Sequence, residues 1–463
     1  MKNTYFLYLI WILSISFSAC NKSFDYREPL PSINFADDVD NKGGIRGGNV
    51  RIRLNLQAVS QLASLRVFES LNGSPAVQID EISSFEDNFR ESAFLYNYLV
   101  DTTANPSLAI GDQIKVIFEL DDLAGRTTNP IEFTINVVGA LFLENTVGLA
   151  GENFIALAPP AGINVTVINE DEYTFETGKK YLIQGRLQIE EGLTVILQPG
   201  TEIYASTANP NNIAVFEVPA ESRILAEGTP DNPILMSSDR VFSGNPAPGD
   251  WQGLEVVGRG GNDNAGILRY LRVEYGGKDA IDLENTGAIR LVEVGSGTSI
   301  DHVQVFQSSG HAIRFNGGSV NARYLVATEV GDDAFRCDNN DVPSGTGYSG
   351  LGQFWYSENL TDSDIEGLEI RDGAFPTLCN ISLIGPGQSG TSQMAATRLR
   401  DNTLGYRIYN ALMAEYPDDG LREDGAIDIA LGLEGNKVVA YSSIFGIGDD
   451  DVRGEAEKFK LNP

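Results

Sequence analysis

A short strand-like segment recurs in the second half of the chain and limits the possible folds more than any other feature. The copies place a small residue and, in most cases, an aliphatic or aromatic one before an outward-pointing polar residue, as in His311-Ala-Ile-Arg-Phe-Asn316 and Asp333-Ala-Phe-Arg-Cys-Asp338. The other copies are residues 279–284, 366–371, 395–400 and 419–424. They recur every 22 to 33 residues without a helical pattern between them, which is typical of a solenoid. The repeat therefore predicts a right-handed parallel β-helix whose rungs share an apolar interior.

Alternation within the copies predicts which side chains face outward. Neighbouring residues of a strand point to opposite faces, so the apolar members should fill the interior. These are Ile281, Leu283, Ile313, Phe315, Phe335, Cys337, Leu368 and Ile370. The polar members should form an outward row with one side chain every ~4.8 Å, namely Asp282, Arg314, Arg336, Glu369, Arg398 and Arg422. This row is either a ligand-binding face or a set of ion pairs with acids such as Asp333, Asp338 and Asp424.

The first part of the chain has a different pattern, with alternating apolar residues separated by turn signals such as Asn72-Gly73. This alternation is typical of half-buried antiparallel strands. Residues 36–140 are therefore expected to form a small immunoglobulin-like β-sandwich, and residues 141–463 the β-helix. The predicted fold class is all-β. We found no candidate chemistry in the sandwich, which we interpret as a spacer.

The N-terminus predicts export. An apolar stretch at residues 5–15 and the small pair Ser18-Ala19 precede Cys20, and together they resemble a bacterial lipoprotein signal. That resemblance implies removal of residues 1–19, acylation of Cys20 and a tether over residues 20–35. The alternative is an ordinary cleaved signal with an incidental cysteine. We expect a lipid-anchored outer-membrane protein. Of the two faces of that membrane, we favour the cell surface over the periplasmic face.

Composition excludes one class of partner. The formal net charge of −31 disfavours nucleic acid, because like charges repel and no basic stretch compensates. The same negative charge favours the binding of divalent cations. Cys337 and Cys379 occupy inward positions on different predicted sheets, so we expect two buried thiols and no disulfide.

Further motifs resemble right-handed parallel β-helix lipoproteins of Bacteroidota-type bacteria. They are residues 228–234, 248–254, 268–277, 295–301, 331–335 and 347–350, together with Gln353-Phe354. The resemblance covers roughly residues 170–385. It implies a surface or outer-membrane lipoprotein with no established general activity, so it informs architecture more than function.

Gly331-Asp332-Asp333 is similar to the paired-aspartate motif of β-helix glycoside hydrolases that act on pectin. Those enzymes need one carboxylic acid and one carboxylate on either side of the scissile bond. This chain departs from their pattern, because Gly310-His311 precedes the pair, a third acid is missing at residues 285–287 and no Arg-Ile-Lys occurs. A calcium-assisted polysaccharide lyase is a second enzyme hypothesis, with Arg314, Arg336 or Arg422 as the base.

Two non-catalytic hypotheses use the same region. Calcium prefers oxygen ligands, and acids gather at two predicted turns, where the candidate ligands are Asp332, Asp333, Asp338, Asn340 and Asp341, or Asp418, Asp419 and Asp424. Clustered aspartates also occur in plain solvated turns. In Phe354-Trp355-Tyr356 at least one ring should be exposed, so Trp355 or Tyr356 could stack on a sugar, unless both belong to the interior.

Our leading functional hypothesis is a non-catalytic binding or assembly component of the cell envelope. Its ligand would be a glycan or a partner outer-membrane protein, and no cofactor is required, although calcium is possible. A carbohydrate-active enzyme and a rigid structural spacer are the alternatives.

Overall fold

The computed structural model describes residues 29–36, 40–85, 90–101, 103–161, 163–279, 287–339, 345–359, 365–387, 394–400, 405–424, 437–440, 442–448 and 450–453. The chain divides into two compact units, Met1–Gly139 and Ala140–Pro463. Apart from one 3-10 helix, η1 (Asp239–Ser243), the regular structure of the described residues is entirely β. None of their helices is long and apolar enough to cross a membrane. Cys20 lies outside the described residues.

The first unit has two sheets around one apolar core. One sheet has the order β1 (Ser32–Phe35), β3 (Asn49–Gln57), β6 (Glu91–Leu99). The other has the order β2 (Asn41–Ile45), β8 (Ile131–Val138), β7 (Gln113–Asp122), β4 (Leu62–Leu71), β5 (Val77–Ile82). Both contribute alternate side chains to the core, among them Leu54, Val67 and Phe118, so the unit is a β-sandwich. Its immunoglobulin-like type stays a prediction.

The sandwich begins earlier than the sequence predicts. Strand β1 lies within the expected tether of residues 20–35 and pairs antiparallel with β3. Ile33 explains the difference, because it is 5% exposed and belongs to the sandwich core. A strand of four residues just after Pro29 and Pro31 carries too weak a periodic signal to be predicted.

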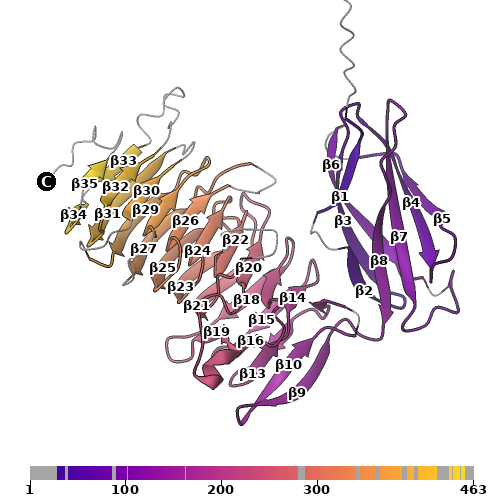
Figure 1. Cartoon of the computed structure of the whole chain (residues 1–463), viewed down its shortest axis with the longest axis horizontal. Coiled ribbons are helices and arrows are strands. Elements are labelled where there is room, and N and C mark those ends of the chain that lie inside the picture. Colours follow the sequence, from indigo (N-terminus) through magenta and orange to yellow (C-terminus); the bar gives the residue numbers. More distant parts are fainter. Residues whose placement is uncertain are drawn as a thin grey trace, which may run out of the picture. The chain divides into compact units, whose positions relative to one another are not determined.

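The second unit is a parallel β-helix, which confirms the predicted fold class (Figure 1). One face is an 11-stranded sheet. Its strands, in order, are β11 (Val165–Ile168), β14 (Arg186–Ile189), β17 (Val215–Val218), β20 (Gly253–Val257), β22 (Ile289–Val292), β24 (Ile313–Asn316), β26 (Phe335–Asp338), β28 (Leu368–Ile370), β30 (Ala395–Leu399), β32 (Asp419–Glu423) and β35 (Asp450–Arg453).

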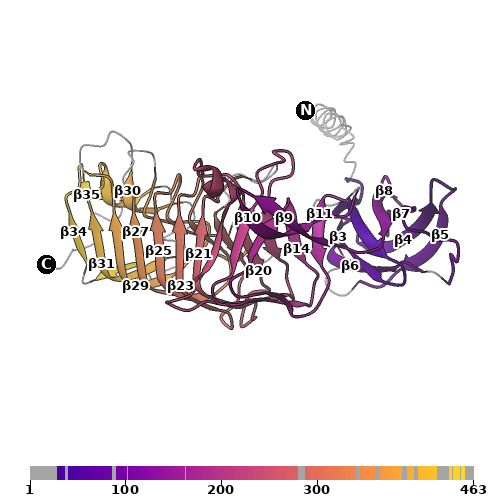
Figure 2. The ribbon, with the colours of Figure 1, turned by 90° about the horizontal axis from the view of Figure 1, so that it is seen from below.

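The opposite sheet starts with an antiparallel pair, β9 (Leu143–Leu149) and β10 (Glu152–Ala158), and continues in parallel. It runs through β13 (Lys180–Ile183), β16 (Glu202–Ala205), β19 (Ile234–Ser238), β21 (Gly266–Glu274), β23 (Ser299–Phe306), β25 (Asn321–Thr328), β27 (Leu351–Glu358), β29 (Thr377–Ile384), β31 (Tyr406–Ala414) and β33 (Lys437–Ala440). Figure 2 shows the long members side by side. Shorter strands flank them: β12 (Tyr173–Phe175), β15 (Thr194–Leu197), β18 (Arg223–Glu227) and β34 (Ser443–Phe445).

The interior confirms the predicted inward positions that the structure describes. Ile313, Phe315, Phe335, Cys337, Leu368 and Ile370 are at most 2% exposed and belong to one continuous core. Ile281 and Leu283 lie outside the described residues. Apolar burial shared between successive rungs is the main source of stability in such a solenoid.

The long strands bend where a left-handed residue interrupts them. Tyr270, His302, Tyr324 and Phe354 occupy corresponding bends, with φ between 46° and 58°. Their rings stack in turn, with centroids 4.4, 4.4 and 4.9 Å apart. A left-handed conformation costs a non-glycine residue roughly 1–2 kcal/mol, and the stacking offsets part of that cost.

Candidate functional site

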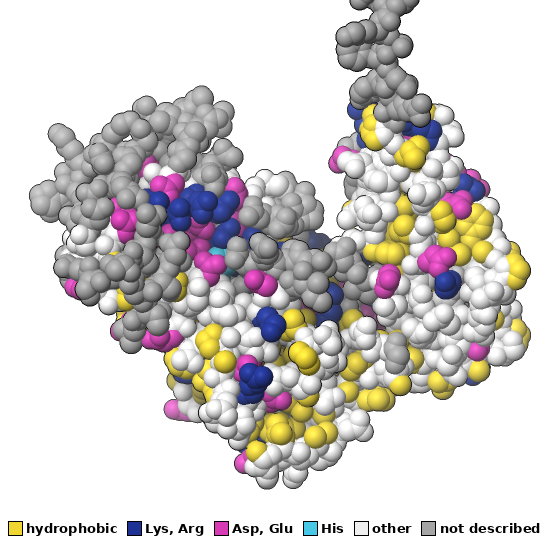
Figure 3. Space-filling model, viewed as in Figure 1, with side chains coloured by type: hydrophobic (Ala, Val, Ile, Leu, Met, Phe, Trp, Pro, Cys, Tyr) yellow, Lys and Arg dark blue, Asp and Glu magenta, His cyan; other side chains and the backbone are white. Residues whose placement is uncertain are grey.

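The 11-stranded sheet carries a row of charged residues, one on each of the eight successive strands from β17 to β32. In the parallel register each of these residues is paired with the next. In order, they are Glu217, Glu255, Arg290, Arg314, Arg336, Glu369, Arg398 and Arg422. We call these eight residues the charge ladder. The register confirms the predicted row from Arg314 onward. In Figure 3, basic and acidic side chains gather together on this part of the β-helix.

The prediction was wrong for the first position of the row, where the sequence pattern placed Asp282. The strand that pairs with β24 is β22, so Arg290 occupies the place before Arg314. Asp282, which the repeat favoured for that place, lies outside the described residues. Residues 288–292 follow the same small–apolar–polar–apolar pattern but end in valine, and for that reason the sequence pattern missed them.

The charge ladder is also less exposed than an outward row should be. Arg290, Arg314, Arg336 and Arg422 are only 7%, 3%, 6% and 8% exposed. Adjacent guanidinium groups repel one another, so burying them requires acids nearby. Asp338 fulfils this role for two rungs: its Oδ2 lies 3.0 Å from Nη2 of Arg314 and 2.6 Å from Nε of Arg336.

A second group of buried ionisable residues surrounds Arg336. We call His311, Asp332, Asp333, Arg336 and Glu369 the His311 cluster. Nη1 of Arg336 lies 3.0 Å from Nε2 of His311 and 3.2 Å from Oε2 of Glu369. Nδ1 of His311 lies 3.5 Å from Oδ1 of Asp332 and 3.4 Å from Oδ2 of Asp333. Only Asp332 reaches solvent appreciably, with 30% of its side chain exposed.

The contact with Arg336 determines the protonation of the imidazole. A guanidinium group only donates hydrogen bonds, so Nε2 of His311 must accept, and a neutral imidazole then carries its proton on Nδ1. This proton faces the carboxylates of Asp332 and Asp333. The three residues bring their possible ligand atoms within 4.8 Å of one another. However, a protonated Nδ1 cannot bind a metal ion, and Nδ1 makes no hydrogen bond to either carboxyl group.

Burial and neighbouring charges separate the pKa values of the cluster. Desolvation raises the pKa of Asp332, and it raises the pKa of the fully buried Asp333 much further, with the charges of Glu369 and Glu366 adding to the effect. Burial alone would raise the pKa of Glu369, but Arg336 and other arginines lower it overall. Burial and the positive charges of Arg336 and Arg314 lower the pKa of His311 well below 6.5.

These pKa shifts predict that His311 and Asp333 contribute opposite pH dependences to the stability of the folded protein. The unfolded state binds more protons than folded His311 below about pH 6.5, so His311 should make wild-type stability fall as pH drops through that range. Folded Asp333 holds its proton above pH 3.8, so it should make stability fall as pH rises. We expect His311→Asn to remove the first dependence and Asp333→Asn the second.

The measurement is urea unfolding from pH 4 to 8, followed by tryptophan fluorescence. Of the three tryptophans of the chain, Trp251 and Trp355 lie in the β-helix unit, and Trp11 lies outside the described residues. If both variants changed the slope of unfolding free energy against pH in the same direction, the assigned protonation states would be wrong.

Several of the predicted calcium ligands form ion pairs with arginines. Asp338 is shared by Arg314 and Arg336, while Asp418 lies 3.3 Å and Asp419 3.9 Å from Arg422, three strands farther along the ladder. Asp424 also contacts Arg422 and Arg398. Asn340 and Asp341 lie outside the described residues. These four carboxylates therefore already have cationic partners, and calcium binding stays a prediction.

The two aromatic residues predicted to bind a ligand, Trp355 and Tyr356, differ in their exposure to solvent. Trp355 is 1% exposed, so its assignment to a ligand surface was wrong. Its ring stacks on Phe315 at 5.0 Å, and its Nε1 donates to the carbonyl of Ala322. Tyr356 is partly exposed and donates its hydroxyl to Glu358. The exposed ring of the segment is that of Phe354, at 38%.

Cys337 is buried as predicted, whereas Cys379 is partly exposed, and both are free thiols. The expectation of two buried thiols was therefore half wrong. The side chain of Cys379 lies on the outer side of β29, since its neighbour Leu378 is fully buried.

Sequence reasoning missed the importance of His311 and Glu366. His311, Asp333 and Glu366 hold the same place in three successive copies of the repeat, immediately before the small residue. Backbone bonds from Ala312 to Asp333 and from Ala334 to Glu366 confirm that these places are stacked. Comparing the first position of each copy, and not only the central one, would have found this column.

Comparisons with known proteins bear on the fold. The sequence model of the pectate-lyase-like β-helix domain matches residues 166–262 and 258–439. The chain is similar to a solved structure, the family 28 exopolygalacturonase of Yersinia enterocolitica, with 8% identity and a TM-score of 0.18 over 92% of this chain and 98% of that one. No curated protein matches. At this TM-score the superposition adds nothing to the fold assignment, which follows from the family match and the strand register.

Proposed function

The chain belongs to the pectate-lyase-like β-helix domain family, and we propose that it is a non-catalytic glycan-binding protein of the cell envelope. One observation carries this proposal: the His311 cluster presents a single carboxyl group, Asp332, over a rigid and internally paired set of buried charges. Charged groups held by such networks are pre-organised hydrogen-bonding partners for polyhydroxylated ligands. The fold supports a carbohydrate ligand, since pectate-lyase-like β-helices are typical of proteins that act on glycans.

The same geometry argues against catalysis by the described residues. Glycoside hydrolysis needs two carboxyl groups that both reach the substrate, but the side chains of Asp333 and Glu369 are 2% and 3% exposed. A lyase needs an accessible base, and Arg314 and Arg336 are buried against Asp338.

We further propose the setting of this activity. Acylation of Cys20, after removal of residues 1–19, would anchor the chain in the outer membrane. The proposed glycan-binding surface around Asp332 would then face the outside of the cell. The Bacteroidota-type lipoproteins that the sequence resembles support this setting, and an immunoglobulin-like sandwich would serve as the spacer. A partner outer-membrane protein is the other ligand considered.

A hydrolase is the second candidate function, because one observation favours it. The raised pKa of Asp332 and the lowered pKa of Glu369 form the kind of split that acid–base pairs show. This candidate would need Glu369 to become accessible when substrate binds.

One experiment separates the two functions. We expect the purified mature protein to be retained on at least one of a panel of immobilised neutral and acidic polysaccharides, and Asp332→Asn to weaken retention about ten-fold, because a charged hydrogen bond is replaced by a neutral one. Glu358→Gln, which alters an acid on the other sheet, is the control and should bind as wild type.

The released fractions are assayed for new reducing ends and for unsaturated products. Product that disappears in the Asp332→Asn, Asp333→Asn double variant would replace the binding proposal with the hydrolase or lyase. No retention on any polysaccharide, with no product, would contradict both.

A further inference from the structure

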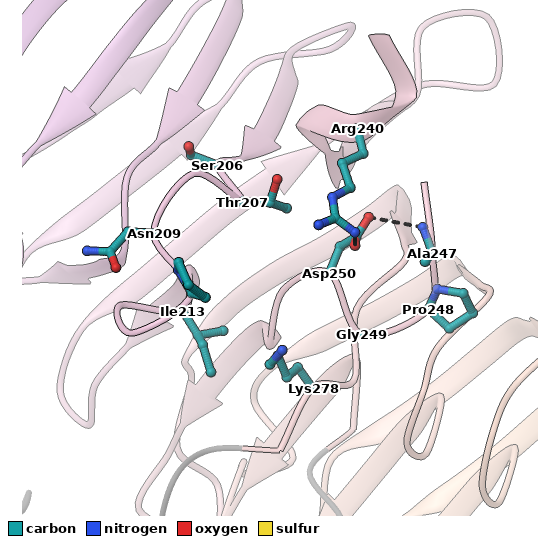
Figure 4. A pocket seen from close by; sticks show the side chains of 11 residues that line it. Ser206, Thr207, Asn209, Ile213, Arg240, Ala247, Pro248, Gly249, Asp250 and Lys278 are labelled. Atoms are coloured by element: carbon teal, nitrogen blue, oxygen red, sulfur yellow. Dashed lines mark hydrogen bonds and ion pairs between the residues drawn. The ribbon is translucent and has the colours of Figure 1, made fainter. Parts of the chain in front are cut away.

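A pocket lies outside the charge ladder, at the turns that connect the two sheets of the β-helix. It is lined by residues 206, 207, 209, 210, 213, 240, 247–250 and 278, and its volume is about 240 Å³. Figure 4 shows Arg240 reaching in from η1 and Lys278 approaching from the opposite wall. We call it the η1 pocket.

The charge of the η1 pocket is opposite to that of the whole chain. Two of its lining residues, Arg240 and Lys278, are basic and one, Asp250, is acidic, whereas the chain has a formal net charge of −31. Basic side chains that converge on one concavity in so acidic a protein indicate a site for an anion.

Asp250 stabilises the wall of the pocket through hydrogen bonds to its neighbours. Its carboxylate accepts hydrogen bonds from the hydroxyl of Ser238 at 2.7 Å, the backbone amide of Ala247 at 3.0 Å and Nη1 of Arg240 at 2.9 Å. The side chain of Asp250 is only 3% exposed. It therefore fixes Arg240 in position and has little capacity left for a ligand.

Arg240 retains the edge of its guanidinium that suits an oxyanion. Asp250 engages Nη1, and among the described residues no partner contacts Nε or Nη2. The side chain is 49% exposed. The Nε–Nη2 edge can make two parallel hydrogen bonds to a carboxylate or a sulfate, which a lysine cannot do.

The remaining walls suit a small polar ring. Ser206, Thr207 and Asn209 provide polar groups, while Pro210, Ile213 and Pro248 provide apolar surface. Pockets for drug-sized ligands span about 300 to 1,000 Å³, so 240 Å³ limits the occupant to about one sugar unit.

The pocket borders the loop that leads to the His311 cluster. A Cβ added to Gly249, which has a φ of +78°, would lie 2.6 Å from Oγ of Ser309, two residues before His311. The charge of Asp279, next to Lys278, contributes to the environment of Asp332. A glycan that contacts Asp332 can therefore extend toward the pocket.

We infer that the η1 pocket binds a single sugar unit carrying an oxyanion, a carboxylate or a sulfate ester, with the Nε–Nη2 edge of Arg240 as its main contact. This inference rests on the proposed glycan-binding function and adds to it a second site with its own ligand chemistry.

The test uses the mature full chain and three probes in NMR titrations: galacturonic acid, galactose 6-sulfate and galactose. We expect one or both acidic sugars to bind and galactose not to bind. Arg240→Gln should weaken that binding at least about ten-fold, because the bidentate contact is lost. Arg259→Gln is the matched control, since it removes one exposed arginine elsewhere and changes the net charge equally. It should change binding less than two-fold.

Arg240→Lys separates geometry from charge, and it should restore little of the affinity. Equal binding of galactose, wild-type affinity in Arg240→Gln, or an equal loss in Arg259→Gln would overturn the inference. So would the absence of binding by all three sugars. If polysaccharide retention through Asp332 persists in that case, only the pocket is rejected. If retention also fails, the proposed function is rejected as well.

Discussion

Asp338→Asn should lower the free energy of unfolding of the β-helix by about 3 to 5 kcal/mol, the cost of leaving buried charge without its partner. Asp338 is fully buried and its carboxylate contacts both Arg314 and Arg336. An asparagine of the same shape keeps the packing but supplies no negative charge. Two adjacent guanidinium groups, on strands paired in register, would then face each other without compensation.

Glu152→Gln provides the comparison for this variant. Glu152 pairs with Lys180 at 3.1 Å, but the two side chains are 50% and 26% exposed, so this loss should cost less than about 1 kcal/mol. Both variants are measured by urea unfolding followed through tryptophan fluorescence at pH 7. A cost for Asp338→Asn as small as that for Glu152→Gln would mean that water reaches the charge ladder, and that its arginines behave as surface residues.

The fold could be predicted because its signal repeats. Each rung buries its apolar residues in the same way, so alternation around Arg314 and Arg336 identifies both the inward side chains and the register of the row. The sandwich was predictable for a related reason, since its long alternating strands, such as β3 and β7, each place every second residue in the core. Ile33, a single buried residue in a short edge strand, offered no such repetition.

The candidate site was less predictable because burial of a charge depends on its partners. The sequence shows Arg336 as a polar residue between apolar ones, and such a residue is normally exposed. Its burial follows from three partners that lie at different distances along the chain: Asp338, His311 and Glu369. Only the rung register brings these together, and that register depends on loops whose lengths vary between copies.

Trp355 and Phe354 show how a one-residue error in facing changes a functional prediction. The two are neighbours on β27, so their side chains take opposite sides of the strand. Phe354 has a positive φ and joins the outer aromatic stack, whereas Trp355 points inward. Both are large aromatic residues, and nothing in their immediate sequence distinguishes them. Aromatic character alone therefore could not assign the exposed ring.

We expect Trp355→Ala to destabilise the β-helix by about 3 to 5 kcal/mol, because a large side chain is removed from a tightly packed core and leaves a cavity. Its ring lies 5.0 Å from that of Phe315 and 4.9 Å from that of Phe335, on two successive rungs of the opposite sheet. The carbonyl of Ala322 would also lose its indole donor. Phe354→Ala, one residue away and exposed, should cost less than about 1.5 kcal/mol.

Far-UV circular dichroism during urea unfolding is the suitable measurement, because the substitution removes a fluorescent residue. Trp355→Phe keeps most of the packing, so it should fold and lose less stability than Trp355→Ala even if the alanine variant cannot be purified. A cost for Phe354→Ala of about 3 kcal/mol or more, together with a negligible cost for Trp355→Phe, would place the buried ring at 354. In that case Trp355 would face solvent, and it would return as a candidate for stacking on a sugar.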